Sequence, residues 1–172
     1  MKKIISVLIV LIMLTCSALA LVGCNNTTDD SGETEEVKYF IPKDYAKLEE
    51  MLNELQYQAD GTDDVDDIEE VLKYTFGIEG IETDSAVAGS GKYDNEYYVC
   101  YFFYSKDDSS AKTLLEELRK YRNEQIEMAE KDGDDRLLEV LENTDKVGRE
   151  ETIVYWCSQQ LLNDIENFDK QN

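Results

Sequence analysis

Cys24, preceded by Leu21-Val22-Gly23, is the residue whose sequence context specifies a reaction most directly. The chain begins Met1-Lys2-Lys3, and an apolar run then leads to this short segment. A basic start, an apolar core and small residues before a cleavage point are typical of a secretory signal peptide. The Leu-x-Gly-Cys ending is typical of a bacterial lipobox, in which the cysteine thiol is acylated and the chain is cleaved in front of it. We therefore expect a mature protein that begins at Cys24, carries fatty-acyl chains such as palmitate, and lies on the extracytoplasmic face of the cell membrane.

A retained transmembrane helix is the alternative, because the run from Ile4 to Val22 approaches the ~18 residues that can span a bilayer. Lysines flank only the start of this run, and a polar tract without a Lys or Arg cluster follows its end. A stop-transfer segment usually carries such a cluster. The pattern favours the lipid anchor, and two or more acyl chains would hold the protein stably on the membrane.

The remaining thiols are Cys100 and Cys157, since Cys16 leaves with the signal peptide. Both lie in apolar runs with β-strand character, and an exported location permits a disulfide. The alternative is that they are two small buried hydrophobic residues, which we favour because sequence cannot supply the required Cα separation. The chain has no histidine, so the commonest metal ligand and general base are absent. We predict no metal site and no cofactor.

Acidic residues dominate the charge, with 39 Asp and Glu against 17 Lys and Arg. A net charge of −22 repels nucleic-acid phosphates and anionic lipid headgroups, so no nucleic-acid partner is expected. The run from Asp60 to Asp67 resembles a calcium loop only superficially, because Val65 and Val71 fall where an EF-hand needs glycine and glutamate. Asp63 or Asp64 is better explained as the N-cap of a following helix. With so many acids, a catalytic carboxylate pair can be neither located nor dismissed.

An aromatic group is the most distinctive feature after the lipobox. Tyr98, Tyr101, Tyr155 and Trp156 lie in two strand-like segments and could form a stacking surface for sugars or for a protein partner. The alternative is that strand aromatics fill the core against helices, as they usually do.

These residues must be positioned by a small domain. We expect a cleaved signal peptide over 1–23, an acidic flexible tether over 24–38 and a single α+β domain over 39–172. Hydrophobic periodicity and turn residues predict the element order ααββααββα, with helices packed on an antiparallel four-stranded sheet made of two β-hairpins. The predicted helices are 44–58, 65–76, 109–131, 137–141 and 159–168. The first hairpin has strands 83–88 and 96–104, and the second turns at Gly148-Arg149 between 146–147 and 151–157.

Several loose motifs accompany the lipobox and the acidic tether. They are Leu-x-x-x-x-Gly-Ile over 72–78, the aromatic strand before Lys106-Asp107, and Leu118-x-x-x-Arg122-x-x-Gln125. Together they resemble an uncharacterised family of small Gram-positive lipoproteins, a domain of unknown function. The resemblance implies a class and a location, and it carries over no activity and no site residue.

The sequence therefore predicts a non-enzymatic binding or interaction module of the cell envelope, whose partner is a protein or a glycan. A small accessory enzyme of cell-wall polymer metabolism that uses carboxylates is the main alternative, and a structural or regulatory lipoprotein is a third. Two acids with raised pKa values in one pocket would favour the enzyme. An exposed tyrosine surface would favour the binding module.

Overall fold

The computed structural model describes residues 38–93 and 96–171. Contacts divide the chain after Glu36, so the described residues belong to one unit, Val37–Asn172. Cys24, the predicted signal peptide and nearly all of the predicted tether lie outside the described residues. Within those residues, no helix has both the length and the apolar character needed to cross a membrane.

A five-stranded antiparallel sheet organises this unit, with strands in the order β1-β2-β3-β5-β4. The strands are β1 Gln58–Thr62, β2 Thr83–Tyr93, β3 Glu96–Ser105, β4 Asp145–Glu150 and β5 Ile153–Ser158. The helices are α2 Tyr45–Glu54, α3 Val65–Val71, α4 Asp108–Asp132, α5 Asp135–Glu139 and α6 Gln159–Gln171. Short π-helical segments, η2 Leu72–Phe76 and η3 Val140–Thr144, extend α3 and α5.

The predicted α+β class, with helices packed on an antiparallel sheet, is confirmed, but the prediction of four strands and the element order are wrong. The missed strand, β1, was assigned to the end of the first helix and the loop after it. Gln56 adopts a left-handed conformation (φ 67°) just after α2 and redirects the chain into β1. The strand is polar and half-exposed, so it lacks the alternation that marks a strand in sequence. Gly61 pairs with Val87 within β1, and α2 approaches it so closely that a Cβ there would lie 2.7 Å from Glu49 Oε2.

The second hairpin turns three residues later than predicted, at Glu151-Thr152, where Glu151 has a positive φ of 52°. Gly148 is therefore not a turn residue. It pairs with Tyr155 inside the ladder, and the Tyr155 hydroxyl lies where a Gly148 side chain would begin. The glycine makes room for a tyrosine on the neighbouring strand.

Aspartates begin four of the helices. Asp44, Asp64, Asp107 and Asp134 each accept a hydrogen bond from a backbone N–H in the first turn that follows. The interpretation of the acidic run before α3 as a helix cap is thus confirmed. In the part of the chain that the structure describes, no group of three or more Cys, Asp or Glu residues is arranged to hold a metal ion.

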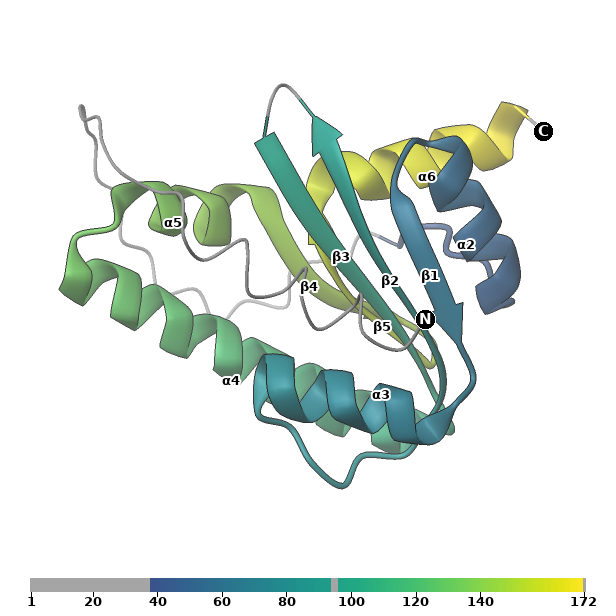
Figure 1. Ribbon diagram of the computed structural model, residues 1–172, viewed down its shortest axis with the longest axis horizontal. Coiled ribbons are helices and arrows are strands. Elements are labelled where there is room, and N and C mark those ends of the chain that lie inside the picture. The colour runs from purple at the N-terminus through teal and green to yellow at the C-terminus, as the bar shows by residue number, and fades with distance from the viewer. Residues whose placement is uncertain (1–37, 94–95, 172) are drawn as a thin grey trace. The chain divides into compact units, whose positions relative to one another are not determined.

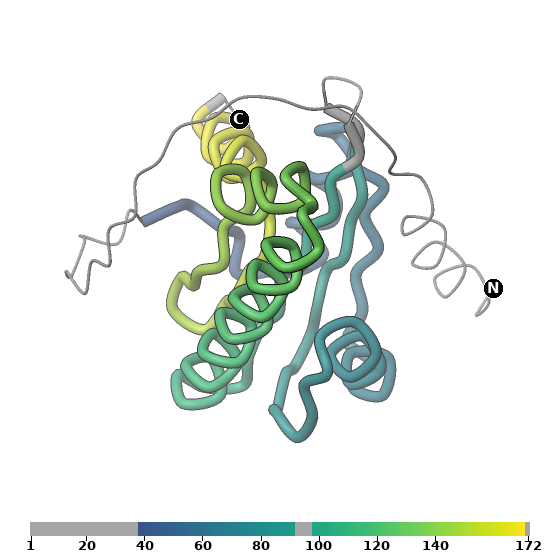
Figure 2. Tube along the Cα trace, turned by 90° about the vertical axis from the view of Figure 1, so that its left-hand side faces the viewer, coloured from purple at the N-terminus to yellow at the C-terminus, as the bar shows by residue number. Residues whose placement is uncertain are grey.

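Helices cover both faces of the sheet, which gives three layers (Figure 1). We name the two sides by their helices. On the α2/α6 face, sheet residues such as Phe102 pack against leucines of both helices. On the α3/α4 face, Phe103 and Val154 pack against α3, η2 and α4. Phe102 and Phe103 are 0% and 1% exposed, so β3 is covered on both sides at these positions. Figure 2 shows α3 and the start of α4 at the same end of the molecule but apart from each other, whereas α5 lies at the other end of α4.

Candidate functional site

The four aromatic residues predicted to form one surface lie on opposite faces of the sheet. Side chains alternate along a strand, so Tyr101 and Trp156 point to the α3/α4 face, and Tyr98 and Tyr155 point to the α2/α6 face. Tyr155 and Trp156 are 5% and 6% exposed and belong to the core. Tyr98 and Tyr101 are half-buried. The structure brings together only Tyr101 and Trp156, which pair directly across β3 and β5.

On the α3/α4 face, successive residue pairs along β2 and β3 become less buried. Ala86 and Phe103 form a cross-strand pair that is buried beneath the helices. The next two pairs on the same face, Ala88 with Tyr101 and Ser90 with Val99, are half-buried. We call Ala88, Ser90, Val99 and Tyr101 the open sheet face.

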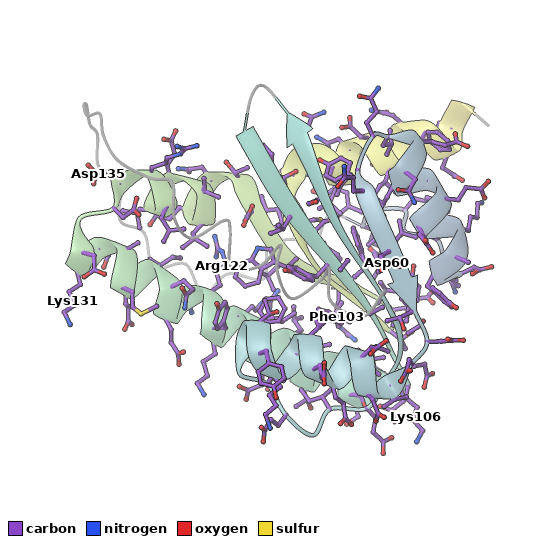
Figure 3. The ribbon with its side chains drawn as sticks, in the orientation of Figure 1. Asp60, Phe103, Lys106, Arg122, Lys131 and Asp135 are labelled. Carbon is purple, nitrogen blue, oxygen red and sulfur yellow. The ribbon has the colours of Figure 1, made fainter. Side chains whose placement is uncertain are left out.

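The open sheet face has a charged border on its β1 side. Asp60 pairs with Ala88, so its carboxylate lies on the same face and is exposed to solvent. Figure 3 labels Asp60 on β1, next to the sheet layer that carries these residues.

Aromatic rings fix Tyr101 in place. Phe76 of η2 is the hub, with ring centroids 5.1 Å from Tyr101, 5.6 Å from Trp156 and 5.4 Å from Tyr121. The Tyr101 and Tyr121 rings meet Phe76 edge to face, an arrangement that adds to the stability gained by burial. Burial also raises the pKa of Tyr101, so its hydroxyl stays protonated at neutral pH. The tyrosine presents a rigid ring with a neutral hydroxyl.

A half-buried polar group, Asp145 with Arg122, adjoins this cluster. Trp156 Nε1 donates a hydrogen bond to Asp145 Oδ2 at 2.8 Å. Arg122 of α4 donates through both Nε and Nη2 to the carbonyl oxygen of Leu141, and Figure 3 shows Arg122 between α4 and the segment leading to β4. Desolvation raises the pKa of Asp145, although Trp156 and Arg122 oppose that shift. Sequence reasoning missed this group, because nothing in the local pattern marks Asp145 among 39 acids.

Carboxylate chemistry needs two acids in complementary states. Asp145 is the one carboxyl group of the described residues whose pKa is clearly raised, and the charged groups that shift it are Arg122 and Lys146 rather than a second acid. The pKa of Glu79 is lowered by Lys73, and that of Asp107 by backbone N–H groups. The pKa of Asp108 is lowered by Arg149 and Lys112.

A hollow of about 320 Å³ lies between α4 and the loop that leads to β2. Its lining consists of Gly77 to Ile81 together with Thr113 and Glu117. Lys73 pairs with Glu79 at 2.7 Å and keeps that carboxylate ionised. The hollow therefore does not combine a proton donor with a base.

Cys100 and Cys157 are both free thiols and are fully buried on the α2/α6 face. They lie on the adjacent central strands β3 and β5, which the sequence could not show.

No family model, curated protein or solved structure matches this chain.

Proposed function

We propose that the chain is a lipid-anchored lipoprotein of the cell envelope, related to uncharacterised small lipoproteins of Gram-positive bacteria, and that it binds a partner protein through the open sheet face. The lipobox at Cys24 supports the anchor and the extracytoplasmic location. The observation that carries the binding role is the half-buried, partly accessible surface of Tyr101, Val99, Ala88 and Ser90, next to the buried pair Ala86 and Phe103.

A protein suits this surface better than a glycan. The lining is apolar or small, and Ser90 supplies the one side-chain hydroxyl apart from that of Tyr101. Sugars need several polar groups to orient them, whereas a protein segment can bury apolar side chains against a rigid tyrosine. Asp60 at the border and the net charge of −22 favour a partner with basic residues beside its apolar segment.

Acylation is tested on protein taken from its own membranes. Mass spectrometry of the N-terminal peptide is expected to show acyl chains on Cys24 and no residues before it. Cys24→Ser is expected to release the protein from the membrane fraction. An unmodified, uncleaved N-terminus would overturn the anchor.

The binding surface is tested by site-specific photo-crosslinking in living cells. A benzoylphenylalanine at position 99 is expected to yield a discrete cross-linked protein, identified by mass spectrometry. The same probe at position 74 is the matched control, because Tyr74 is 76% exposed and lies on η2, outside the open sheet face. Tyr101→Ser is expected to reduce the position-99 product at least ~10-fold without unfolding the protein, because a central aromatic contact often contributes 2 kcal/mol or more.

Two results would contradict the proposal. Identical products from positions 99 and 74 would mean that the contact is nonspecific. A position-99 product that loses its added mass to glycan-degrading enzymes and yields no peptides of a second protein would make the partner a glycan.

A further inference from the structure

The ladder between β3 and β5 ends one step before Cys100 and Cys157. Tyr104 pairs with Ile153, Phe102 with Tyr155 and Tyr101 with Trp156. Continued by one residue, this antiparallel register would set Cys100 opposite Cys157. Directly opposed residues have Cα atoms about 4.5 or 5.5 Å apart, depending on the type of pair, and both values lie within the range that a disulfide spans.

The side chains of the two cysteines point to the same side. Both belong to the core cluster beneath α2 and α6, and each is 0% exposed. The pKa of the Cys157 thiol is raised by burial first and by the charge interaction with Cys100 second, in keeping with their place in one cluster.

The Cys100 side chain lies over a glycine of β2. Gly89 pairs with Cys100, and a Cβ at Gly89 would come within 3.0 Å of the Cys100 Sγ atom, so the sulfur leans towards β2 and must rotate towards β5 to reach Cys157. Tyr57, from the connection between α2 and β1, packs against the same cluster, and burial first and the two thiols after it raise its pKa to about 12. The pair is thus covered by a tyrosine in the folded protein.

We propose that Cys100 and Cys157 form a cross-strand disulfide that joins the two β-hairpins when the protein folds outside the cytoplasm. The oxidising location rests on the proposed function, whereas the pairing rests on the sheet register. The bond would connect β3 to β5 and close a long loop that contains α4, α5 and β4.

The reaction is thiol–disulfide exchange with an oxidising disulfide, carried by a thiol oxidoreductase or by a small molecule. One cysteine thiolate attacks a sulfur of the oxidant, which forms a mixed disulfide and releases the first oxidant thiolate. The other cysteine thiolate then attacks the protein sulfur of that mixed disulfide and releases the second. Two electrons pass to the oxidant, and the two protons lost by the cysteines complete its reduction to two thiols.

The order of events follows from burial. In the folded protein the pKa of Cys100 is raised to about 12, so the thiol is protonated and unreactive. The exchange must therefore take place before α6 and Tyr57 cover the strands. Once formed, the bond is shielded from reductants.

The test uses full-length protein recovered from its own membranes, quenched in acid and alkylated under denaturing conditions without reduction. Trypsin separates residues 93–106, which contain Cys100, from residues 150–170, which contain Cys157. We expect a single linked species of these two peptides that reduction splits. Two alkylated peptides would show that the bond does not form in the cell.

Refolding of the reduced full-length chain with oxidised glutathione tests separately whether the two cysteines can pair and whether the protein lies in an oxidising compartment. Linked peptides after refolding, with alkylated thiols in the cell, would support the pairing and contradict the oxidising compartment of the proposed function. Alkylated thiols in a correctly refolded protein would overturn the disulfide itself.

A stability measurement supplies the matched control. A reductant added during unfolding is expected to lower the midpoint temperature of the oxidised protein by on the order of 10 °C, because the bond restricts a long loop of the unfolded chain. Cys100→Ala/Cys157→Ala is expected to show no response to reductant. If the wild type and the double variant respond equally, the bond is absent.

Discussion

The two faces of the sheet are built from the same strands but differ in how completely they are closed. The centre of the α2/α6 face is covered by aliphatic helix residues, including Leu48, Leu52, Leu161, Leu162 and Ile165, all 0% exposed, and only its margins, such as Tyr98, are half-buried. The α3/α4 face packs around the ring of Phe76 and becomes less buried towards the open sheet face. The difference indicates that one face holds the domain together, whereas the other combines stability with a surface that could bind a partner.

The largest effect is expected on the closed face. Phe102→Ala should lower the free energy of unfolding by ~3–5 kcal/mol, because it leaves a cavity beneath two helices. Urea denaturation measures this change. Tyr74→Ala, at a side chain that is 76% exposed, is the control and should change stability by less than ~0.5 kcal/mol. Similar losses for the two variants would mean that the α2/α6 face is not the main source of stability.

A methyl group added to β4 should also destabilise the closed face. Gly148→Ala places a Cβ against the Tyr155 hydroxyl, and overpacking of this kind costs ~1–3 kcal/mol. Thermal unfolding measures the loss. Combining it with Tyr155→Leu should recover part of that loss relative to Tyr155→Leu alone. An equal cost of Gly148→Ala in both backgrounds would contradict the contact.

The aromatic hub should respond with a spectroscopic change and a smaller loss. Phe76→Leu keeps most of the apolar volume but removes ring contacts with Tyr101, Tyr121 and Trp156, which should cost ~1–2 kcal/mol. Because Trp156 is the only tryptophan, its fluorescence reports directly on this face. The emission should shift, whereas Phe102→Leu should leave it nearly unchanged. Equal shifts would argue against separate faces.

The smallest effect is a pH dependence on the α3/α4 face. The folded pKa of Asp145 lies above its unfolded value, so protonation of Asp145 favours the folded state. Its contribution is fully present below about pH 4 and is lost as the pH rises through the folded pKa. The stability of the wild type relative to Asp145→Asn should therefore fall from pH 4 towards neutrality, as followed by urea titrations at several pH values. A difference that stays flat or rises would contradict this assignment.

Sequence patterns were most informative where a residue acts locally. Asp64, one of the two aspartates predicted to cap the second helix, does so, and Gly133 ends α4 in a left-handed conformation. They failed where the deciding neighbour is distant in sequence. Gly61 and Gly148 resemble breakers, yet each lies in a strand because a side chain from another element occupies the space above it.

The candidate site shows the same limit. Tyr101 and Trp156 were identified from composition, but strand alternation places the four aromatic residues on two faces. The pKa of Asp145 is raised only because the fold desolvates this carboxyl group beside Trp156, which the local sequence does not show. The opposition of Cys100 and Cys157 depends on how two separate hairpins align, which no local pattern encodes.

Under the proposed lipid anchoring, the outer edge of β1 has a consequence for many copies of the protein crowded on one membrane. The Asn53 side chain accepts a hydrogen bond from the Ala59 N–H at 3.0 Å and donates one to the Ala59 carbonyl at 3.4 Å. An amide of α2 thus occupies backbone groups that another strand would otherwise use. Exposed strand edges invite sheet-to-sheet polymerisation, and tethering raises the local concentration of such edges. Asn53 would therefore help neighbouring molecules on the membrane to remain separate instead of joining edge to edge into fibrils.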